Sequence, residues 1–276
     1  SDENFPVASF LIAPQYRAPV LAFYRFVRFA DDIADHPSAS QHEKLRLLEE
    51  MRATLVGESD ASPEGVGLRA ILNERGLAPV HALDLLEAFR RDVTKLRYAD
   101  WHDLMDYCRY SAMPVGRFVL EVHGETRKTW AANDALCAAL QVINHLQDCK
   151  VDYLEMNRVY VPVDHLAAEG LTVEALAEAK MSPALRRVLD RLLDETEELM
   201  VRARQLPAAL RDTRLRCESA AIVRLADTLI AHLRRRDPLA ERVKLSKPAM
   251  LWCLVQGIAW ALLTPKPAVK TAGKRA

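Results

Sequence analysis

Two pairs of aspartates constrain this chain most, because each pair lies inside a segment whose apolar residues follow a helical period. Asp31 and Asp35 form the first pair, and Asp148 and Asp152 form the second. Residues four apart stand one above the other on the same face of an α-helix. Two carboxylates stacked in this way repel each other and are costly to bury. We therefore expect the two helices to share one site, where cations and an anionic ligand offset the negative charge.

Polar residues precede both pairs with the same spacing. The first stripe consists of Tyr24, Arg28, Asp31 and Asp35. The second consists of Gln141, His145, Asp148 and Asp152, with Asn144 beside it. Steps of three and four residues keep each stripe on one helix face. Carboxylates suit Mg²⁺, which prefers oxygen ligands, keeps several waters and is often completed by substrate phosphates. The stripes therefore predict a magnesium site for a phosphorylated ligand.

Two other interpretations of the acidic residues are open. An acidic run on one helix is often a solvent-facing surface, and Asp148 and Asp152 would then be ordinary ion-pair partners of Lys150 or Arg158. Two matching stripes are harder to explain in that way, so we favour the shared site. A metal-storing carboxylate bundle would need Glu-x-x-His pairs, and the stripes contain none.

The composition excludes several classes of protein. The chain has 276 residues with 38 Lys and Arg against 38 Asp and Glu, whereas nucleic-acid-binding proteins are normally basic. Five cysteines without a CxxC pair and eight histidines without an HExxH motif argue against a disulfide framework and a zinc site. The acidic start lacks the basic region of a secretory signal. We expect a cytoplasmic globular protein, with peripheral contact to the inner membrane as an alternative.

The apolar periodicity predicts an all-helical chain. We find no alternating strand pattern and no glycine-rich phosphate loop. Helices are expected near residues 17–36, 41–56, 80–97, 101–110, 114–124, 133–156, 173–180, 183–206, 213–235 and 247–263. Asn133 and Ser182 mark two helix starts, whereas 57–67 is expected to be a surface loop. We expect one domain over 1–264 and a disordered tail over 265–276.

Segment 247–263 is the most apolar part of the chain, yet it is short for a membrane span of about 20 residues. We favour a helix buried in the core. The alternative is contact with a membrane surface, because Trp252 and Trp260 lie at helical spacing and lysines flank both ends of the segment.

Five of the seven phenylalanines lie before residue 30. They are Phe5, Phe10, Phe23, Phe26 and Phe29. They are expected to form either a local core or an apolar pocket beside the metal site. In a pocket, aromatic faces would stabilise a passing carbocation.

Four segments together resemble squalene and phytoene synthases. Residues 24–35 resemble the first aspartate-rich motif of that family, and residues 141–152 resemble the second. Residues 107–116 and 158–162 resemble the segments between and after these motifs. The match covers nearly the whole chain. It implies an all-α isoprenoid-synthase helical bundle with a central Mg²⁺–diphosphate cavity.

The resemblance also implies roles for individual residues. The Mg²⁺ ligands would be Asp31, Asp35, Asp148 and Asp152. The substrate-binding residues would be Tyr24, Arg28, Asp32, Gln141, Gln147 and Arg158, with Phe5 and Phe10 around the hydrocarbon. The catalytic residues would be Tyr107, Asn144 and His145. Which residue positions the water molecule is left open among Tyr107, Asn144, His145 and Gln147.

The chain departs from condensing members of the family at two places. Residues 4–10 lack the lysine usual there, and Gln147 replaces a common arginine. Both changes remove positive charge near the diphosphate. Several segments resemble bacterial hydroxysqualene synthases of hopanoid synthesis, which form one branch of the family. They are residues 4–9, 144–148, 237–239 and 242–247.

The favoured activity is therefore conversion of presqualene diphosphate and water to hydroxysqualene, without NADPH. The expected functional partners are a presqualene diphosphate synthase and a downstream reductase. One alternative is a sister enzyme that makes presqualene diphosphate, squalene or phytoene from two prenyl diphosphates. Another is a non-catalytic assembly or binding relative, although such a protein should have lost some of the aspartates.

Overall fold

The computed structural model describes residues 13–264, and this part of the chain is built from helices. The first six are α1 (Pro14–Ala34), α2 (Gln41–Leu55), α3 (Pro63–Arg75), α4 (Val80–Thr94), α5 (Trp101–Ser111) and α6 (Met113–Val122). A 3₁₀ turn, η1 (Arg127–Thr129), leads into α7 (Trp130–Met156), α8 (Val163–Ala168) and a second 3₁₀ turn, η2 (Val173–Ala177). The chain continues through α9 (Pro183–Ala203), α10 (Leu206–Ala209), α11 (Thr213–Leu233) and α12 (Lys247–Leu263). The prediction of an all-α fold is confirmed.

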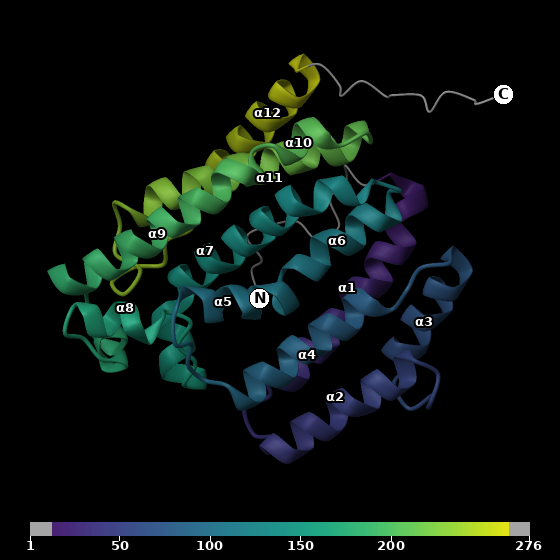
Figure 1. Ribbon diagram of the computed structural model, residues 1–276, viewed down its shortest axis with the longest axis horizontal. Coiled ribbons are helices and arrows are strands. Elements are labelled where there is room, and N and C mark those ends of the chain that lie inside the picture. The colour runs from purple at the N-terminus through teal and green to yellow at the C-terminus, as the bar shows by residue number, and fades with distance from the viewer. Residues whose placement is uncertain (1–12, 265–276) are drawn as a thin grey trace.

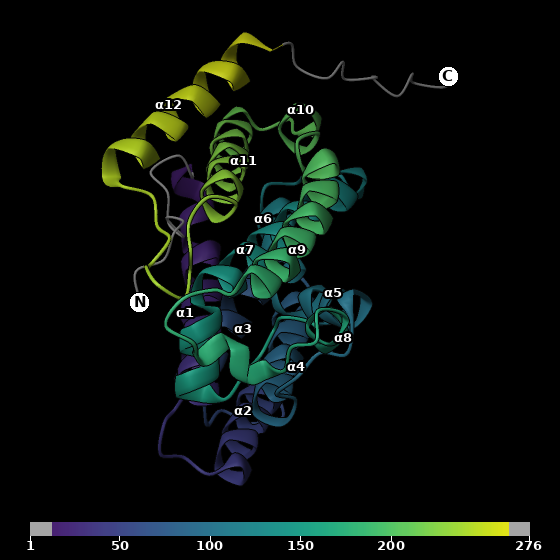
Figure 2. The same ribbon diagram turned by 90° about the vertical axis from the view of Figure 1, so that its left-hand side faces the viewer.

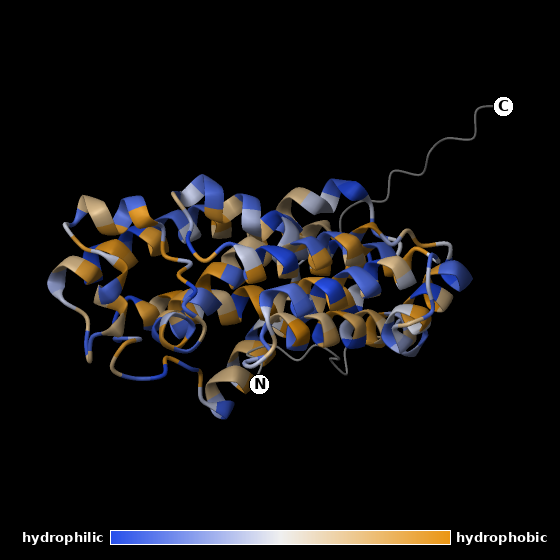
Figure 3. Ribbon diagram, turned by 90° about the horizontal axis from the view of Figure 1, so that it is seen from below, coloured by the Kyte–Doolittle hydropathy of each residue, from blue (hydrophilic) through white to orange (hydrophobic). Residues whose placement is uncertain are grey.

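Helix α7 runs through the middle of the molecule and packs against α6, α9 and α11 (Figure 1). Helices α1 and α4 pack together on the other side, with α2 and α3 outside them (Figures 1 and 2). Hydrophobic and hydrophilic residues alternate in short stretches along the helices (Figure 3), as expected for helices that each bury one face. One large buried cluster includes Phe26, Leu48 and Leu85, a second surrounds α7, and a small third one lies between α11 and α12. The polar stripes of α1 and α7 lie where these two groups of helices meet.

The short helices α8 and α10 were not predicted, and several helix boundaries differ from the predictions. Helix α3 occupies part of the expected loop 57–67, because the Ser62 side chain caps it by accepting a hydrogen bond from Gly65 N at 3.1 Å. Helix α7 begins at Trp130 rather than at Asn133, and Asn133 is buried inside it. Residues 173–177 form a 3₁₀ turn, not an α-helix. The predicted start at Ser182 is confirmed by its bond from Leu185 N at 3.1 Å.

Helix α12 corrects the expectation of a core helix. Its buried residues are Cys253, Gly257 and Ala261, which form one face against α11. A Cβ on Gly257 would lie 2.5 Å from the backbone of Ala221 in α11, so only glycine permits this close approach. The remaining faces of α12 are largely exposed. Between residues 13 and 264, no helix has both the length and the apolar character needed to cross a membrane.

Candidate active site

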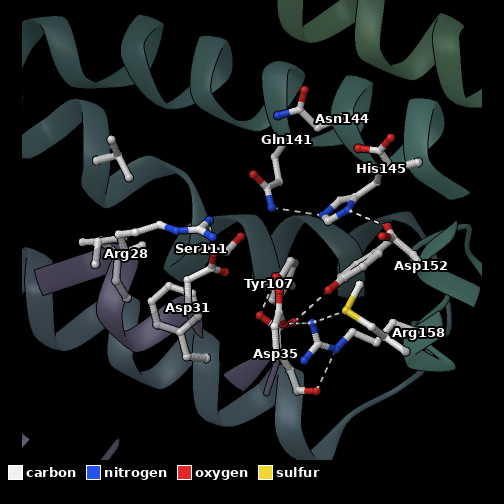
Figure 4. Close-up of a pocket in the computed structure, with 18 of the residues that line it drawn as sticks. Arg28, Asp31, Asp35, Tyr107, Ser111, Gln141, Asn144, His145, Asp152 and Arg158 are labelled. Carbon is white, nitrogen blue, oxygen red and sulfur yellow. Dashed lines mark hydrogen bonds and ion pairs between the residues drawn. The ribbon is translucent and has the colours of Figure 1, made fainter. Parts of the chain in front are cut away.

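The two polar stripes face one cavity of about 480 Å³ between α1, α4, α5 and α7. From α1 it is lined by Tyr24, Val27, Arg28, Asp31 and Asp35. From α7 it is lined by Gln141, Asn144, His145, Asp148 and Asp152. The structure therefore brings together residues more than 100 positions apart in the sequence, as the matched spacing predicts (Figure 4).

On the α1 wall, Arg28 forms ion pairs with two aspartates. Its Nη1 lies 2.9 Å from Asp31 Oδ2, and its Nη2 lies 2.8 Å from Asp32 Oδ1. Burial and the neighbouring Asp35 carboxylate raise the pKa of Asp31 from 3.8 to about 6, although Arg28 opposes the shift. The raised pKa means that the folded protein stabilises the ionised carboxylate less well than water does.

On the α7 wall, Gln141, His145 and Asp152 form a chain of polar contacts. The Gln141 amide nitrogen donates to His145 Nε2 at 3.1 Å. The proton of the neutral imidazole then lies on Nδ1, which faces Asp152 Oδ2 at 3.7 Å. Burial and the charge of Asp152 raise the pKa of Asp148, while Arg242 and Lys244 partly offset the shift. The second pair thus resembles the first electrostatically.

Asp92 lies beneath the two walls and was not predicted as a site residue. Tyr107 Oη donates to its Oδ2 at 3.0 Å, and Tyr160 Oη donates to its Oδ1 at 2.9 Å. His145 stacks on Tyr160, with ring centroids 3.5 Å apart. Burial raises the pKa of the Asp92 carboxyl. Leu85 and Phe89 lie seven and three residues before Asp92 and also line the cavity. The three residues share one helix face, so an acidic residue on an otherwise apolar stripe could have identified Asp92 as a site residue from the sequence.

Arg158, which follows α7, contacts the end of the first motif directly. Its Nη1 lies 2.6 Å from Asp35 Oδ1, and its Nη2 donates to Ala34 O at 3.2 Å. Asn157, in the left-handed conformation with φ 53°, ends α7 and turns the chain so that Arg158 points back toward α1. The alternative in which Arg158 pairs with the second aspartate pair is therefore wrong.

Lys150 is not a partner of the second pair either. Its Nζ donates to Glu178 O at 2.8 Å and to Leu239 O at 3.2 Å. Both alternatives that treated Asp148 and Asp152 as members of ordinary ion pairs with these cations therefore fail. The carboxylates instead face the cavity.

Four predicted site residues are not among those that line this cavity. Two of them lie within residues 13–264 on other surfaces, and two lie beyond that range. Asp32 points away from it, with 57% of its side chain exposed. Gln147 is buried on another face of α7, where its amide donates to Val243 O. Phe5 and Phe10 lie outside the described residues.

Of the two alternatives for the early phenylalanines, the local core is confirmed for Phe23 and Phe26. Phe23 and Phe26 belong to the apolar cluster of α1–α4, whereas Phe29 is 41% exposed. Within residues 13–264, the phenylalanine and tyrosine side chains that line the cavity are Tyr24, Phe89, Tyr107 and Tyr160. Sequence position alone could not distinguish the core-facing side of α1 from the cavity side, because aromatic residues occur on both.

The carboxylates fit Mg²⁺ held jointly with a diphosphate. Within residues 13–264, no three His, Cys, Asp or Glu side chains lie close enough to hold an ion by themselves. Mg²⁺ is commonly bound by one or two carboxylates plus waters and substrate phosphates. A cavity with one aspartate pair on each wall offers such partial ligand sets.

Known proteins resemble this chain over most of its length. The squalene/phytoene synthase family model matches residues 1–249. The hydroxysqualene synthase of Sinorhizobium fredii is 52% identical over 250 residues, covering 91% of this chain and 86% of that protein. The corresponding protein of Rhodopseudomonas palustris is 55% identical over 244 residues, covering 88% and 84%.

Solved structures show the same fold. The squalene synthase HpnC from Alicyclobacillus acidocaldarius superimposes with a TM-score of 0.73 at 32% identity, covering 83% of this chain and 87% of that one. A dehydrosqualene synthase superimposes with a TM-score of 0.79 at 20% identity, covering 91% and 88%. The second likeness shows the fold alone. The predicted resemblance to this family, and to its hydroxysqualene synthases, is confirmed.

Proposed function

The chain belongs to the squalene/phytoene synthase family, and we propose that it converts presqualene diphosphate and water to hydroxysqualene and inorganic diphosphate. The observation that carries the proposal is the single cavity with an aspartate pair on each wall, in a chain at least 52% identical to hydroxysqualene synthases. In this reaction the carbon–oxygen bond breaks and diphosphate leaves with the electron pair. The cyclopropylcarbinyl cation that remains rearranges with opening of its three-membered ring. A water oxygen then bonds to the rearranged cation, and the proton released by that water passes to diphosphate or solvent.

We assign the diphosphate to the end of the cavity that carries the charged groups. Asp31, Asp35, Asp148 and Asp152 would hold Mg²⁺, which when bound supplies Lewis-acid stabilisation of the negative charge on the leaving diphosphate. Arg28 and Tyr24 lie beside the first pair and would contact the diphosphate oxygens. A planar guanidinium suits such oxygens because it can donate two parallel hydrogen bonds.

We assign the hydrocarbon to the part of the cavity lined by Phe89, Tyr107 and Tyr160. Aromatic faces attract a cation through their quadrupoles. Asp92 fixes both tyrosine hydroxyls, and His145 is held between Gln141 and the Tyr160 ring. A fixed, partly dry wall favours one conformation of the cation over many.

Tyr107, Asn144 and His145 are the candidates for positioning the water, since all three line the cavity. The functional partners would be an enzyme that forms presqualene diphosphate and a reductase that consumes the alcohol. Because the substrate chains and the product are strongly apolar, we expect these transfers to occur near a membrane surface.

The test is to offer presqualene diphosphate with Mg²⁺ in ¹⁸O-labelled water, without NADPH. The expected product is an alcohol carrying one labelled oxygen, together with released diphosphate. An unlabelled alcohol would mean that a phosphorus–oxygen bond had broken, so the reaction would be mere phosphate hydrolysis. Farnesyl diphosphate alone should give little product. Presqualene diphosphate accumulating from farnesyl diphosphate, or squalene formed with NADPH, would assign the protein to a condensing sister.

A further inference from the structure

The outward face of α12 exposes an unusual concentration of apolar side chains. Leu251 and Trp252 are each 61% exposed, Val255 is 49% exposed, and Leu262 and Leu263 are 63% and 85% exposed. These five are among 13 exposed large hydrophobic residues between positions 13 and 264, although α12 has only 17 residues. Their spacing places them on one side of the helix, opposite the face that packs on α11. Figure 2 shows α12 at the outer edge of the molecule. We call this surface the α12 face.

Basic residues are concentrated after residue 241, although acidic and basic residues balance over the chain as a whole. The chain as a whole has equal numbers of acidic and basic residues. After Glu241, however, the sequence contains no Asp or Glu and seven basic residues. These are Arg242, Lys244, Lys247, Lys266, Lys270, Lys274 and Arg275. Positive charge therefore precedes and follows the apolar helix.

We propose that the α12 face docks on the surface of an anionic membrane, with the helix axis parallel to the bilayer. Helices that lie at a membrane surface typically combine an apolar face that contains tryptophan with lysines close to it. Basic residues close to such a helix are attracted by anionic headgroups. The 17-residue helix is too short to span a bilayer, which needs about 20 apolar residues.

A second copy of the chain fits this face less well than a membrane. A two-fold contact would place the same surface on both sides of the interface. The cationic segments that flank α12 would then face one another and repel. An anionic lipid surface instead complements them.

Co-sedimentation with vesicles tests the proposal on the full chain. Vesicles of equal parts phosphatidylglycerol and phosphatidylcholine should carry the protein down, and binding should weaken at least about tenfold in phosphatidylcholine alone or in high salt. The double variant Leu251→Glu/Trp252→Glu should bind the vesicles that contain phosphatidylglycerol at least about tenfold more weakly than the parent chain does. Val201→Glu is the matched control, because Val201 in α9 is also 61% exposed but lies outside the α12 face. It should bind like the parent chain.

The outcomes separate the proposal from its rivals. Circular dichroism and turnover of detergent-dispersed substrate should stay unchanged in the double variant, because both residues are exposed and neither lines the cavity. Absence of vesicle binding, or binding that the double variant leaves intact, would overturn the proposal. The proposal would also be overturned if the parent chain were a dimer by gel filtration that did not bind vesicles, and if the double variant were a monomer. Because sedimentation is measured without substrate, its failure would leave the proposed reaction untouched.

Discussion

Replacing Asp31 by asparagine should stabilise the metal-free protein at neutral pH while removing its response to metal and diphosphate. Asp31 shares the cavity with Asp35, and its pKa is raised to about 6 by burial and by this neighbouring charge. A carboxyl with a raised pKa binds more protons in the folded state than in the unfolded state. Its stabilising contribution is therefore present at low pH and is lost as the pH rises through about 6.

The size of the effect follows from the shift. From 3.8 to about 6 is roughly two pKa units, which corresponds to about 3 kcal/mol as an upper bound. The Asp31 side chain is 36% exposed, so solvent screening reduces the effect to roughly 1–2 kcal/mol. Asp31→Asn also removes the ion pair with Arg28, which is worth only a few tenths of a kcal/mol. The net gain at neutral pH should therefore be about 1 kcal/mol.

Urea unfolding in EDTA, at about pH 7.5 and at about pH 5, measures this gain and its decline on acidification. A second series with Mg²⁺ and inorganic diphosphate should stabilise the parent chain more than the variant. Asp32→Asn is the matched control, because Asp32 pairs with the same Arg28 but is 57% exposed and outside the cavity lining. Its free energy of unfolding should change by less than about 0.5 kcal/mol. Destabilisation of metal-free Asp31→Asn at neutral pH, or an undiminished response to Mg²⁺ and diphosphate, would refute the reasoning.

Three further predictions concern other parts of the molecule. Arg28→Lys should raise KM for the diphosphate substrate about tenfold in steady-state assays, because it keeps the charge and loses the planar donor pair; an unchanged KM would leave Arg28 as an intrahelical ion-pair partner only. Asp92→Asn should cost about 1–3 kcal/mol in urea unfolding, because one of the two tyrosine hydroxyls loses its acceptor oxygen and meets an amide nitrogen instead; no change would mean that the network is dispensable. Gly257→Ala should lower thermal stability by about 1–3 kcal/mol, because the added Cβ would meet the Ala221 backbone at 2.5 Å. A neutral result there would contradict the close packing of α11 and α12.

The polar stripes were predictable because their signal is local to each helix. Arg28 and Asp31 lie one turn apart on α1, as do Gln141 and His145 on α7, so helical periodicity alone places them on a common face. That both faces meet across one cavity followed from the matched pattern and from the cost of burying paired carboxylates. Periodicity also located most helices to within a few residues. It did so because their apolar stripes and caps act within one or two turns.

Residues whose role depends on contacts between distant segments were harder to predict. In the sequence, Asp92 is one more charged residue on an amphipathic helix. Its role becomes clear only in the structure, where Tyr107 and Tyr160 donate hydrogen bonds to it. Arg158 reaches Asp35 only because the chain reverses at Asn157. Helix α3 was missed for a different reason. Its Ser62 cap was present in the sequence, but the glycines around it suggested a loop.

Both functional surfaces proposed here are places where the local sequence conflicts with its surroundings. In the cavity, Asp31 and Asp148 are carboxylates with raised pKa values among apolar helices. On the α12 face, Leu251 and Trp252 are large apolar side chains in contact with water. Each arrangement costs free energy in the isolated chain, and each cost falls when a ligand of complementary character binds: a metal–diphosphate in the first case and a lipid surface in the second. Since ligand binding offsets the cost, the protein should be more stable with both ligands than without them, and the two gains should add, because the cavity lining and the α12 face share no residues.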